Sequence, residues 1–207
     1  MPSTNLLASC TLPTMYGDFA MHVFGDAEGQ EEVVALVHGT AGDTRPLVRL
    51  HSACFTGDIL GSLRCDCGPQ LTAALQLMAK EPHGILLYLT RHEGRGIGLA
   101  NKVKAYELQE RGLDTVAANV QLGLPADARD YTPAVRTLLQ LGVRDVRLAT
   151  NNPQKIKALA AGGLTVERVP HGGFVNPHNT DYLRVKDILM GHLDAAGTSV
   201  GDRERAE

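Results

Sequence analysis

The segment GILLYLTRHEGRGIGLANKVKAYELQERG, residues 84–112, has the three parts of a strand–loop–helix unit. Its first apolar run, ILLYL, predicts a buried strand. The glycine-rich loop HEGRGIG follows at 92–98, and then a helix on which Leu99, Val103 and Tyr106 share one face. A chain that passes from a strand through a loop into a helix builds parallel sheets covered by helices.

The same alternation continues toward the C-terminus. We expect, in order, a helix from Thr132, a strand over Val146–Thr150, a helix from Asn152, a strand over Leu164–Val169 and a last helix from about Asp181. Both Thr132 and Asn152 precede a proline, and these residue types are typical of the first positions of a helix.

The first third of the chain is different, because short apolar runs alternate with turns. We expect strands over Phe19–Phe24, Val33–His38 and Leu47–Leu50, followed by a helix from about Pro69. The predicted fold class is therefore α/β, with layers of parallel strands and helices and a β-rich N-terminal part. We expect one compact catalytic domain over residues 1–193, with no second catalytic segment, and a polar, disordered tail over 194–207.

Composition narrows the class of protein. The 207 residues are 43% hydrophobic and 21% charged, close to the averages of globular proteins, and the net charge is −3. No Lys- and Arg-rich stripe is present, so we expect no nucleic-acid partner. No run approaches the ~20 apolar residues of a membrane span, and the N-terminus does not resemble a signal peptide, so we expect no membrane partner and a cytoplasmic protein.

Three of the four cysteines lie close together in HSACFTGDILGSLRCDCGPQ, residues 51–70. Cys54, Cys65 and Cys67 offer three soft thiolates, a donor set that suits zinc. Buried cysteines that act only as small apolar side chains are the alternative. The charged neighbours Arg64 and Asp66 favour the metal site instead.

Three protein ligands leave one zinc coordination position for water, whose pKa zinc lowers to about 7. A fourth ligand, for which Cys10 and His51 are candidates, would close the site and make it structural. We expect Cys10 to lie in a mobile segment, so the open, catalytic site is favoured.

The loop HEGRGIG precedes a helix, where backbone amides and the helix N-terminus can bind phosphate. Arg95 is a candidate partner for phosphate or guanine, and Glu93 for the donor edge of a purine. The alternative is a solvated loop in which Glu93 and Arg95 pair with each other. Leu99 stands where a dinucleotide-binding fingerprint has its third glycine, and the chain has no Walker A sequence.

Four segments of the chain, in this order, resemble the GTP cyclohydrolase II family: RLHSACFTGDILGSLRCDCGPQL, GILLYLTRHEGRGIGLANKVKAYELQERGLDTVAAN, LGLPADARDY and LATNNPQKI. The resemblance implies opening of the GTP imidazole ring with loss of formate and pyrophosphate. The product would be 2,5-diamino-6-ribosylamino-4(3H)-pyrimidinone 5′-phosphate, the first intermediate of riboflavin biosynthesis. It also implies a homodimer. We expect Mg²⁺ beside the triphosphate, because the few cations of the chain do not suffice to neutralise the departing pyrophosphate.

The resemblance assigns roles to positions of this sequence. It makes Cys54, Cys65 and Cys67 the ligands of one zinc ion. The positions that match GTP contacts are Arg49, Leu50, His51, Ser52, Ala53, Gln70, Glu93, Gly94, Arg95, Thr115, Thr150 and Lys155.

Three further positions match catalytic residues of the family. Asp127 matches a proton acceptor, and Arg129 matches an arginine proposed to take the α-phosphate covalently. A guanidinium is a poor nucleophile, so an electrostatic clamp on the phosphate, or an ion pair that only fixes a loop, are alternatives for this pair. Tyr106 matches a tyrosine near the purine, with core packing as its alternative. For Lys155 the alternative is an ordinary exposed lysine.

Four positions depart from the family pattern: Ala53, Thr90, Ala117 and His171. Ala53 replaces the usual glutamate beside a zinc ligand. These departures keep open a paralog that performs part of the reaction or uses another purine nucleotide. A further hypothesis is a non-catalytic GTP-binding module with a structural zinc, in which Cys10 is the fourth ligand.

Overall fold

The computed structural model describes residues 4–40, 42, 45–113, 115–125, 127–180, 182–184, 186, 191–193 and 197. Its centre is one seven-stranded sheet with the order β1-β2-β3-β5-β4-β6-β7. The strands are β1 Asn5–Thr14, β2 Gly17–Gly25, β3 Glu31–Gly39, β4 Leu47–Ser52, β5 His83–Leu89, β6 Asp145–Ala149 and β7 Thr165–Val169. The helices are α1 Phe55–Asp58, α2 Cys67–Met78, the 3₁₀ helix η1 Thr90–Gly96, α3 Leu99–Glu110, α4 Thr115–Gln121, α5 Thr132–Gln140 and α6 Pro153–Ala161.

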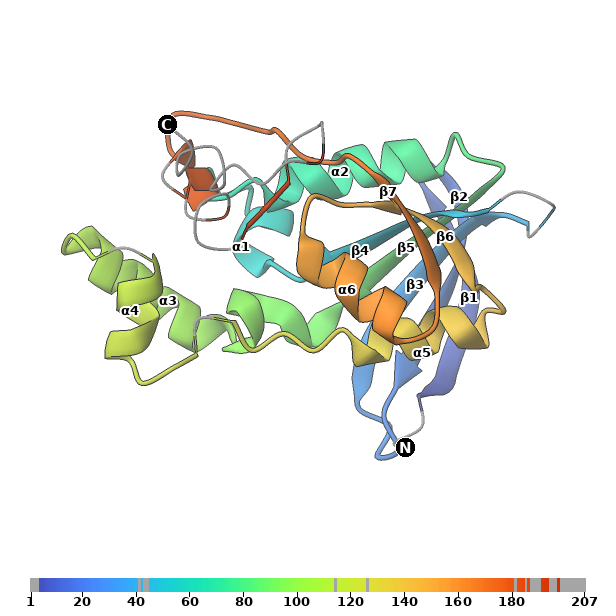
Figure 1. The fold of residues 1–207 in the computed structure, drawn as a ribbon, viewed down its shortest axis with the longest axis horizontal. Helices are drawn as coiled ribbons and strands as arrows, with labels where there is room; N and C mark the ends of the chain where they lie inside the picture. Colours follow the sequence, from blue (N-terminus) through green and yellow to red (C-terminus); the bar gives the residue numbers. More distant parts are fainter. Residues whose placement is uncertain are drawn as a thin grey trace.

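The sheet has an antiparallel half and a parallel half. Neighbours from β1 through β2 and β3 to β5 pair antiparallel, whereas β5-β4, β4-β6 and β6-β7 pair parallel. This arrangement confirms the predicted α/β class with a β-rich N-terminal part. Figure 1 shows α6 beside the parallel half and α5 beside β3, while α3 and α4 extend away from the sheet.

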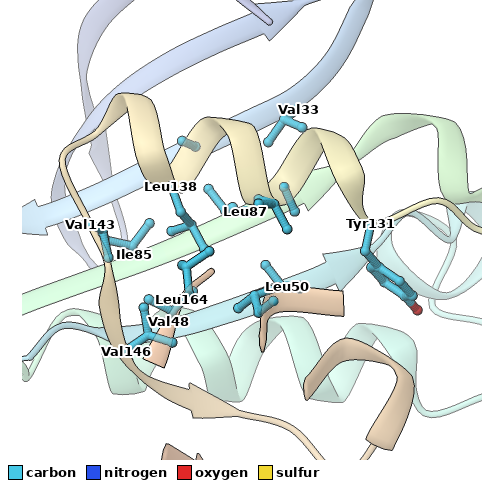
Figure 2. Close-up of a cluster of buried hydrophobic side chains, with 14 of the residues drawn as sticks. Val33, Val48, Leu50, Ile85, Leu87, Tyr131, Leu138, Val143, Val146 and Leu164 are labelled. Atoms are coloured by element: carbon cyan, nitrogen blue, oxygen red, sulfur yellow. The ribbon is translucent and has the colours of Figure 1, made fainter. Parts of the chain in front are cut away.

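Helices cover both faces of the sheet, because successive residues of a strand point to opposite sides. Val48, Leu50 and Leu87 pack with α5 and α6 in the larger core cluster (Figure 2), whereas Leu47 and Leu86 pack with α2 on the other face. Strands buried on both faces read as nearly continuous apolar runs, and this explains why ILLYL was recognisable in the sequence.

The structure corrects two expectations, one about the segment with Cys10 and one about α3. The segment with Cys10 was expected to be mobile, but it forms β1, which pairs along its whole length with β2. On α3, the predicted apolar face is wrong: Leu99 and Val103 are 38% and 53% exposed, and Lys102 and Ala105 are buried instead. Helix α4 had no counterpart in the prediction.

The C-terminal expectations are tested only in part. Asp181 lies outside the described residues, but residues 180, 182–184 and 186 are helical, in agreement with a last helix there. The expected tail, 194–207, lies outside the described residues except for Gly197. No helix within the described ranges combines the length and the apolar character that crossing a membrane requires.

Candidate active site

A cavity of about 1310 Å³ lies where the parallel strands end. The residues that follow β4, β5 and β6 all reach it, namely Ala53 after β4, His92 in η1 and Thr150 after β6. In α/β sheets, ligands bind outside the carboxyl ends of parallel strands. The strand order therefore places this cavity at the expected position of a ligand site.

The three clustered cysteines form one wall of the cavity. The Sγ atoms of Cys54, Cys65 and Cys67 all lie within 4.8 Å of one another, and those of Cys54 and Cys65 are 3.7 Å apart. Two thiolates on a tetrahedral zinc with Zn–S bonds of about 2.3 Å are separated by roughly 3.8 Å. The separation of the Cys54 and Cys65 sulfur atoms therefore matches that of two ligands of one zinc ion, and the third sulfur lies close enough to join them.

Gly57 leaves the space that such an ion and its ligands need. A Cβ atom at this position would meet Cys65 Sγ at 2.8 Å and Cys54 Sγ at 3.2 Å. Only glycine allows α1 to pack this close to the sulfur atoms. Gly57 gave no signal in the sequence, because its importance depends on the folded positions of Cys54 and Cys65.

The metal group has three members. Cys10 lies on the exposed edge strand β1, and His51 donates through Nε2 to Asp58, so neither belongs to the group found among the described residues. Hydrogen bonds from the Cys65 and Cys67 thiols lower the pKa of Cys54, whereas its hydrogen bond with Cys54 raises the pKa of Cys65 to about 11.

Lys102 is a site residue that sequence analysis missed. Its Nζ lies 3.1 Å from Cys54 Sγ, 2.9 Å from Thr56 Oγ1 and 2.7 Å from Glu93 Oε1. Burial opposes its charge, but the Glu93 hydrogen bond and the Cys54 thiolate raise the pKa of Lys102 above its ordinary value. The sequence around Lys102 did not indicate this role, because the residues that it contacts lie in α1, at the start of α1 and in η1, outside its own helix.

Glu93 does not pair with Arg95 as the solvated-loop alternative supposed. Its Oε2 accepts from the backbone N of Phe55 at 2.5 Å, and its Oε1 accepts from Lys102. Glu93 is not among the described residues that line the cavity. Its carboxylate therefore faces the metal loop, the segment 53–67 that carries the three cysteines, and not the cavity.

Arg95 has the features of an anion site. It lines the cavity, its φ is 64°, and its Nη2 is buried without a partner among the described atoms. A positive φ is unfavourable for a residue other than glycine, and such strain is typical of functional sites. The backbone N of Ala128 donates to Arg95 O at 2.9 Å, so this loop and the 127–129 segment are held together.

Arg129 reaches the cavity from that segment. Asp127 binds it through two parallel hydrogen bonds, Nε to Oδ1 at 2.8 Å and Nη2 to Oδ2 at 2.5 Å. Burial disfavours both charges, but this pairing lowers the pKa of Asp127 and raises the pKa of Arg129. Arg129 lines the cavity, whereas Asp127 lies behind it.

Two further basic side chains contact the parallel strands, Arg49 from within β4 and Lys155 from α6. Arg49 donates to Ala149 O at 2.8 Å and also to Gln70, and Lys155 donates to Leu50 O at 2.7 Å. Lys155 is buried, so it is not the exposed lysine of the alternative reading. Burial, together with the nearby charge of Arg49, lowers its pKa well below the ordinary value.

Histidines connect the loops of the site. His92 donates through Nε2 to Asp130 O at 2.9 Å, and its Nδ1 lies 3.2 Å from Ser52 Oγ. Burial lowers the pKa of His92 to about 4, so the ring is neutral and its Nδ1 accepts from the serine. Burial likewise lowers the pKa of His171, which donates to Gln70 O, to about 4.

Most of the predicted site residues come together in this cavity. It is lined by Arg49, His51, Ser52, Ala53, Cys54, Cys65, Cys67, Gln70, Gly94, Arg95, Tyr106, Arg129, Thr150 and Lys155. The Arg64 guanidinium stacks over the Tyr106 ring, with its Cζ atom 4.7 Å from the centre of the ring. Tyr106 belongs to neither core cluster. Leu50 points into the core instead, and the side chain of Thr115 lies outside the described residues.

Three of the departures from the family pattern can be placed relative to the cavity. Thr90 donates to the carbonyl oxygens of Glu31 and Glu32 at 3.1 and 3.0 Å and is not a described lining residue. Ala53 lines the cavity directly beside Cys54, and His171 also faces it. Of these three departures, Ala53 and His171 therefore face the cavity and Thr90 does not.

The cavity is strongly basic although the chain is acidic. Eight of its described lining residues are Lys or Arg, and two are Asp or Glu. The fold collects these basic side chains from segments that are distant in the sequence. Such a cavity attracts a polyanion.

Comparisons with known proteins agree with this geometry. The sequence model of the family described as GTP cyclohydrolase II matches residues 5–170. GTP cyclohydrolase-2 of Neisseria meningitidis serogroup A is 53% identical over 191 residues, which are 91% of this chain and 96% of that protein. GTP cyclohydrolase-2 of Pseudomonas paraeruginosa is 53% identical over 193 residues, 92% of this chain and 94% of that protein.

Longer relatives match as well. Riboflavin biosynthesis protein RibBA of Salinispora tropica is 54% identical over 190 residues, which are 91% of this chain and 48% of that protein. The chain therefore spans about half the length of the RibBA proteins that it matches.

Proposed function

The chain belongs to the GTP cyclohydrolase II family, and on this basis we propose that it hydrolyses GTP with zinc, opening the imidazole ring and releasing formate and pyrophosphate for riboflavin biosynthesis. The observation that carries the proposal is the three-cysteine group at the wall of a basic cavity. Together these features supply the two requirements of the reaction, a site for a hydrolytic metal and a site for a triphosphate.

Cys54, Cys65 and Cys67 would hold the zinc ion. When bound, zinc would act as a Lewis acid that makes water a nucleophile at neutral pH. The chain contributes the remaining geometry: Gly57 leaves room for the ligands, and the Asp58 carboxylate fixes the loop by accepting from the backbone N of Cys54 at 3.0 Å. We propose that the purine lies beside Tyr106, which faces the cavity near the cysteines.

Arg129 would act on the α-phosphate as an electrostatic clamp. The raised pKa of its guanidinium makes it a poor nucleophile, and the bidentate pair with Asp127 fixes the direction in which its free N–H group points. Asp127 thus has a positioning role in this proposal. Arg95 offers further positive charge to the departing pyrophosphate.

Magnesium, the homodimer and the compartment are further parts of the proposal. Mg²⁺ would accompany the triphosphate, as is general for phosphate-releasing enzymes. A second copy would cover exposed apolar side chains near α1 and α3, among them Ile59, Leu60 and Val103. The free thiols of the metal group suit the reducing cytoplasm.

Ala53 supports a second candidate, a paralog that completes only part of the reaction. The residue faces the cavity and offers no carboxylate beside the metal ligand. Loss of such a supporting group reduces activity or metal affinity by roughly 10- to 100-fold. A paralog of this kind would release pyrophosphate faster than formate.

The proposal is tested by metal analysis together with product analysis. The purified protein should hold one zinc per chain, and Cys65→Ser should lose both zinc and ring opening. Cys10→Ser is the matched control, because Cys10 lies on the exposed edge strand, and it should keep both. Loss of zinc from the Cys10 variant, or ring opening by the Cys65 variant, would contradict the proposed site.

A further inference from the structure

A buried lysine joins the metal loop to the glycine-rich loop. The Lys102 side chain is 10% exposed, and its ammonium contacts Cys54, Thr56 and Glu93. An ammonium has three protons to donate, so these three contacts use its full capacity. A buried ammonium with all three hydrogen bonds made is held in one position, unlike a lysine whose charged end extends into solvent.

The partner atoms explain why a cation belongs there. Three thiolates and one Zn²⁺ ion carry a net charge of −1, and Glu93 adds a second negative charge 2.7 Å from the ammonium. Buried charges are tolerated when they are paired and hydrogen-bonded. The ammonium of Lys102 lies between the metal group and the Glu93 carboxylate and supplies a compensating positive charge. It donates to Cys54 Sγ, a sulfur that would bind the metal.

Glu93 extends this contact to the backbone. Its Oε2 accepts from the backbone N of Phe55, the residue after Cys54, at 2.5 Å. Its Oε1 also accepts from the backbone N of Gly94 at 3.1 Å. The pair therefore binds the side chain of Cys54 and the backbone next to it. It also fixes the start of the loop that carries Arg95.

We propose that Lys102 is a positioning residue that, with Glu93, holds the Cys54 thiolate and couples metal binding to the conformation of the glycine-rich loop. This inference rests on the proposed zinc site. It adds a residue outside the metal ligands and outside the positions matched to GTP contacts. It also gives Glu93 a role that its orientation away from the cavity supports.

The test compares Lys102→Met with Lys104→Met, an exposed lysine on the same helix. Zinc affinity is measured by competition with a chromophoric chelator, and the cobalt-substituted proteins are compared by absorption. Lys102→Met should bind zinc about 10- to 100-fold more weakly and shift the thiolate-to-cobalt charge-transfer band, while Lys104→Met matches the parent. Unchanged affinity and an unchanged band in a folded Lys102→Met protein would overturn the inference.

Two further variants keep the outcome decisive. Glu93→Gln preserves shape and should weaken zinc binding in the same direction, and the double variant should lose less than the sum of the single losses. If Lys102→Met does not fold, Lys102→Arg, which keeps the positive charge, is compared with Glu93→Gln. Lys102→Arg should then bind zinc more tightly than Glu93→Gln, and weaker binding would count against the inference. A parent protein that binds no zinc would instead refute the proposed function, so the two failures are distinguishable.

Discussion

Asp127 holds Arg129 through two parallel hydrogen bonds of 2.8 and 2.5 Å, and only the arginine reaches the cavity. The fork of the guanidinium matches the two carboxylate oxygens, which fixes both its orientation and its charge. The arginine is therefore prepared to meet an anion before the anion binds.

Replacement of Asp127 by Asn should remove this preparation. Asn keeps the shape of the side chain but offers one acceptor and no charge, so Arg129 loses its fixed direction. We expect pyrophosphate release to fall by about 100-fold or more. Asp145→Asn is the control, since Asp145 pairs with Arg45 at the far end of the sheet, and it should behave as the parent. A rate within twofold of the parent for Asp127→Asn would be inconsistent with the clamp.

Gly57→Ala should damage the metal group directly. The added Cβ would lie 2.8 Å from Cys65 Sγ, so the sulfur atoms must move apart. We expect the zinc content of the purified protein, measured by elemental analysis, to fall well below one per chain. Gly42→Ala is the matched control, because nothing lies within 4 Å of that position. Full zinc occupancy in Gly57→Ala would show that α1 is less tightly packed than described.

Stability should decrease in mild acid because buried histidines resist protonation. His92 has a pKa of about 4 in the folded protein against 6.5 ordinarily, so the unfolded chain takes up the proton first as the pH falls. The contribution of neutral His92 to the free energy of unfolding is complete above about pH 6.5 and is lost between about pH 6.5 and pH 4. His92→Gln keeps a donor and an acceptor and should reduce the loss of unfolding free energy between pH 7.5 and pH 5 by on the order of 2 kcal/mol.

Urea unfolding at the two pH values measures this effect. His178→Gln, at an exposed position, is the control and should leave the pH dependence unchanged. Equal pH dependence in His92→Gln and the parent would mean that His92 does not carry the effect.

Thr90→Val should separate stability from activity. The Thr90 hydroxyl donates to two carbonyl oxygens of β3 and lies outside the cavity. We expect a loss of about 1 kcal/mol in unfolding free energy. The kcat/KM for GTP should stay within twofold of the parent value. A tenfold change in kcat/KM without a change in zinc content would place Thr90 in the substrate site after all.

The sequence predicted the elements that depend on local signals. The buried strand β5 follows from its apolar run, and α6 follows from Asn152, whose side chain accepts from Gln154 N as an N-cap should. The three cysteines were predicted as one group from their spacing and composition, and the structure confirms that they are close together.

The elements that were missed depend on contacts with distant residues. β1 is exposed over most of its length, so it has no strong apolar pattern, and pairing with β2 alone makes it a strand. On α3 the buried face contains a lysine because Cys54 and Glu93 supply its partners. The basic character of the cavity was hidden for the same reason, since its cations come from segments across the whole chain.

The most direct test of the proposed function measures formate and pyrophosphate in one incubation of zinc-loaded protein with GTP and Mg²⁺. Equal molar yields of both, with the ring-opened nucleotide as the third product, are the result that the site geometry predicts. Pyrophosphate without formate would contradict the complete reaction and favour the partial paralog. Neither product, with GTP still bound, would contradict catalysis itself.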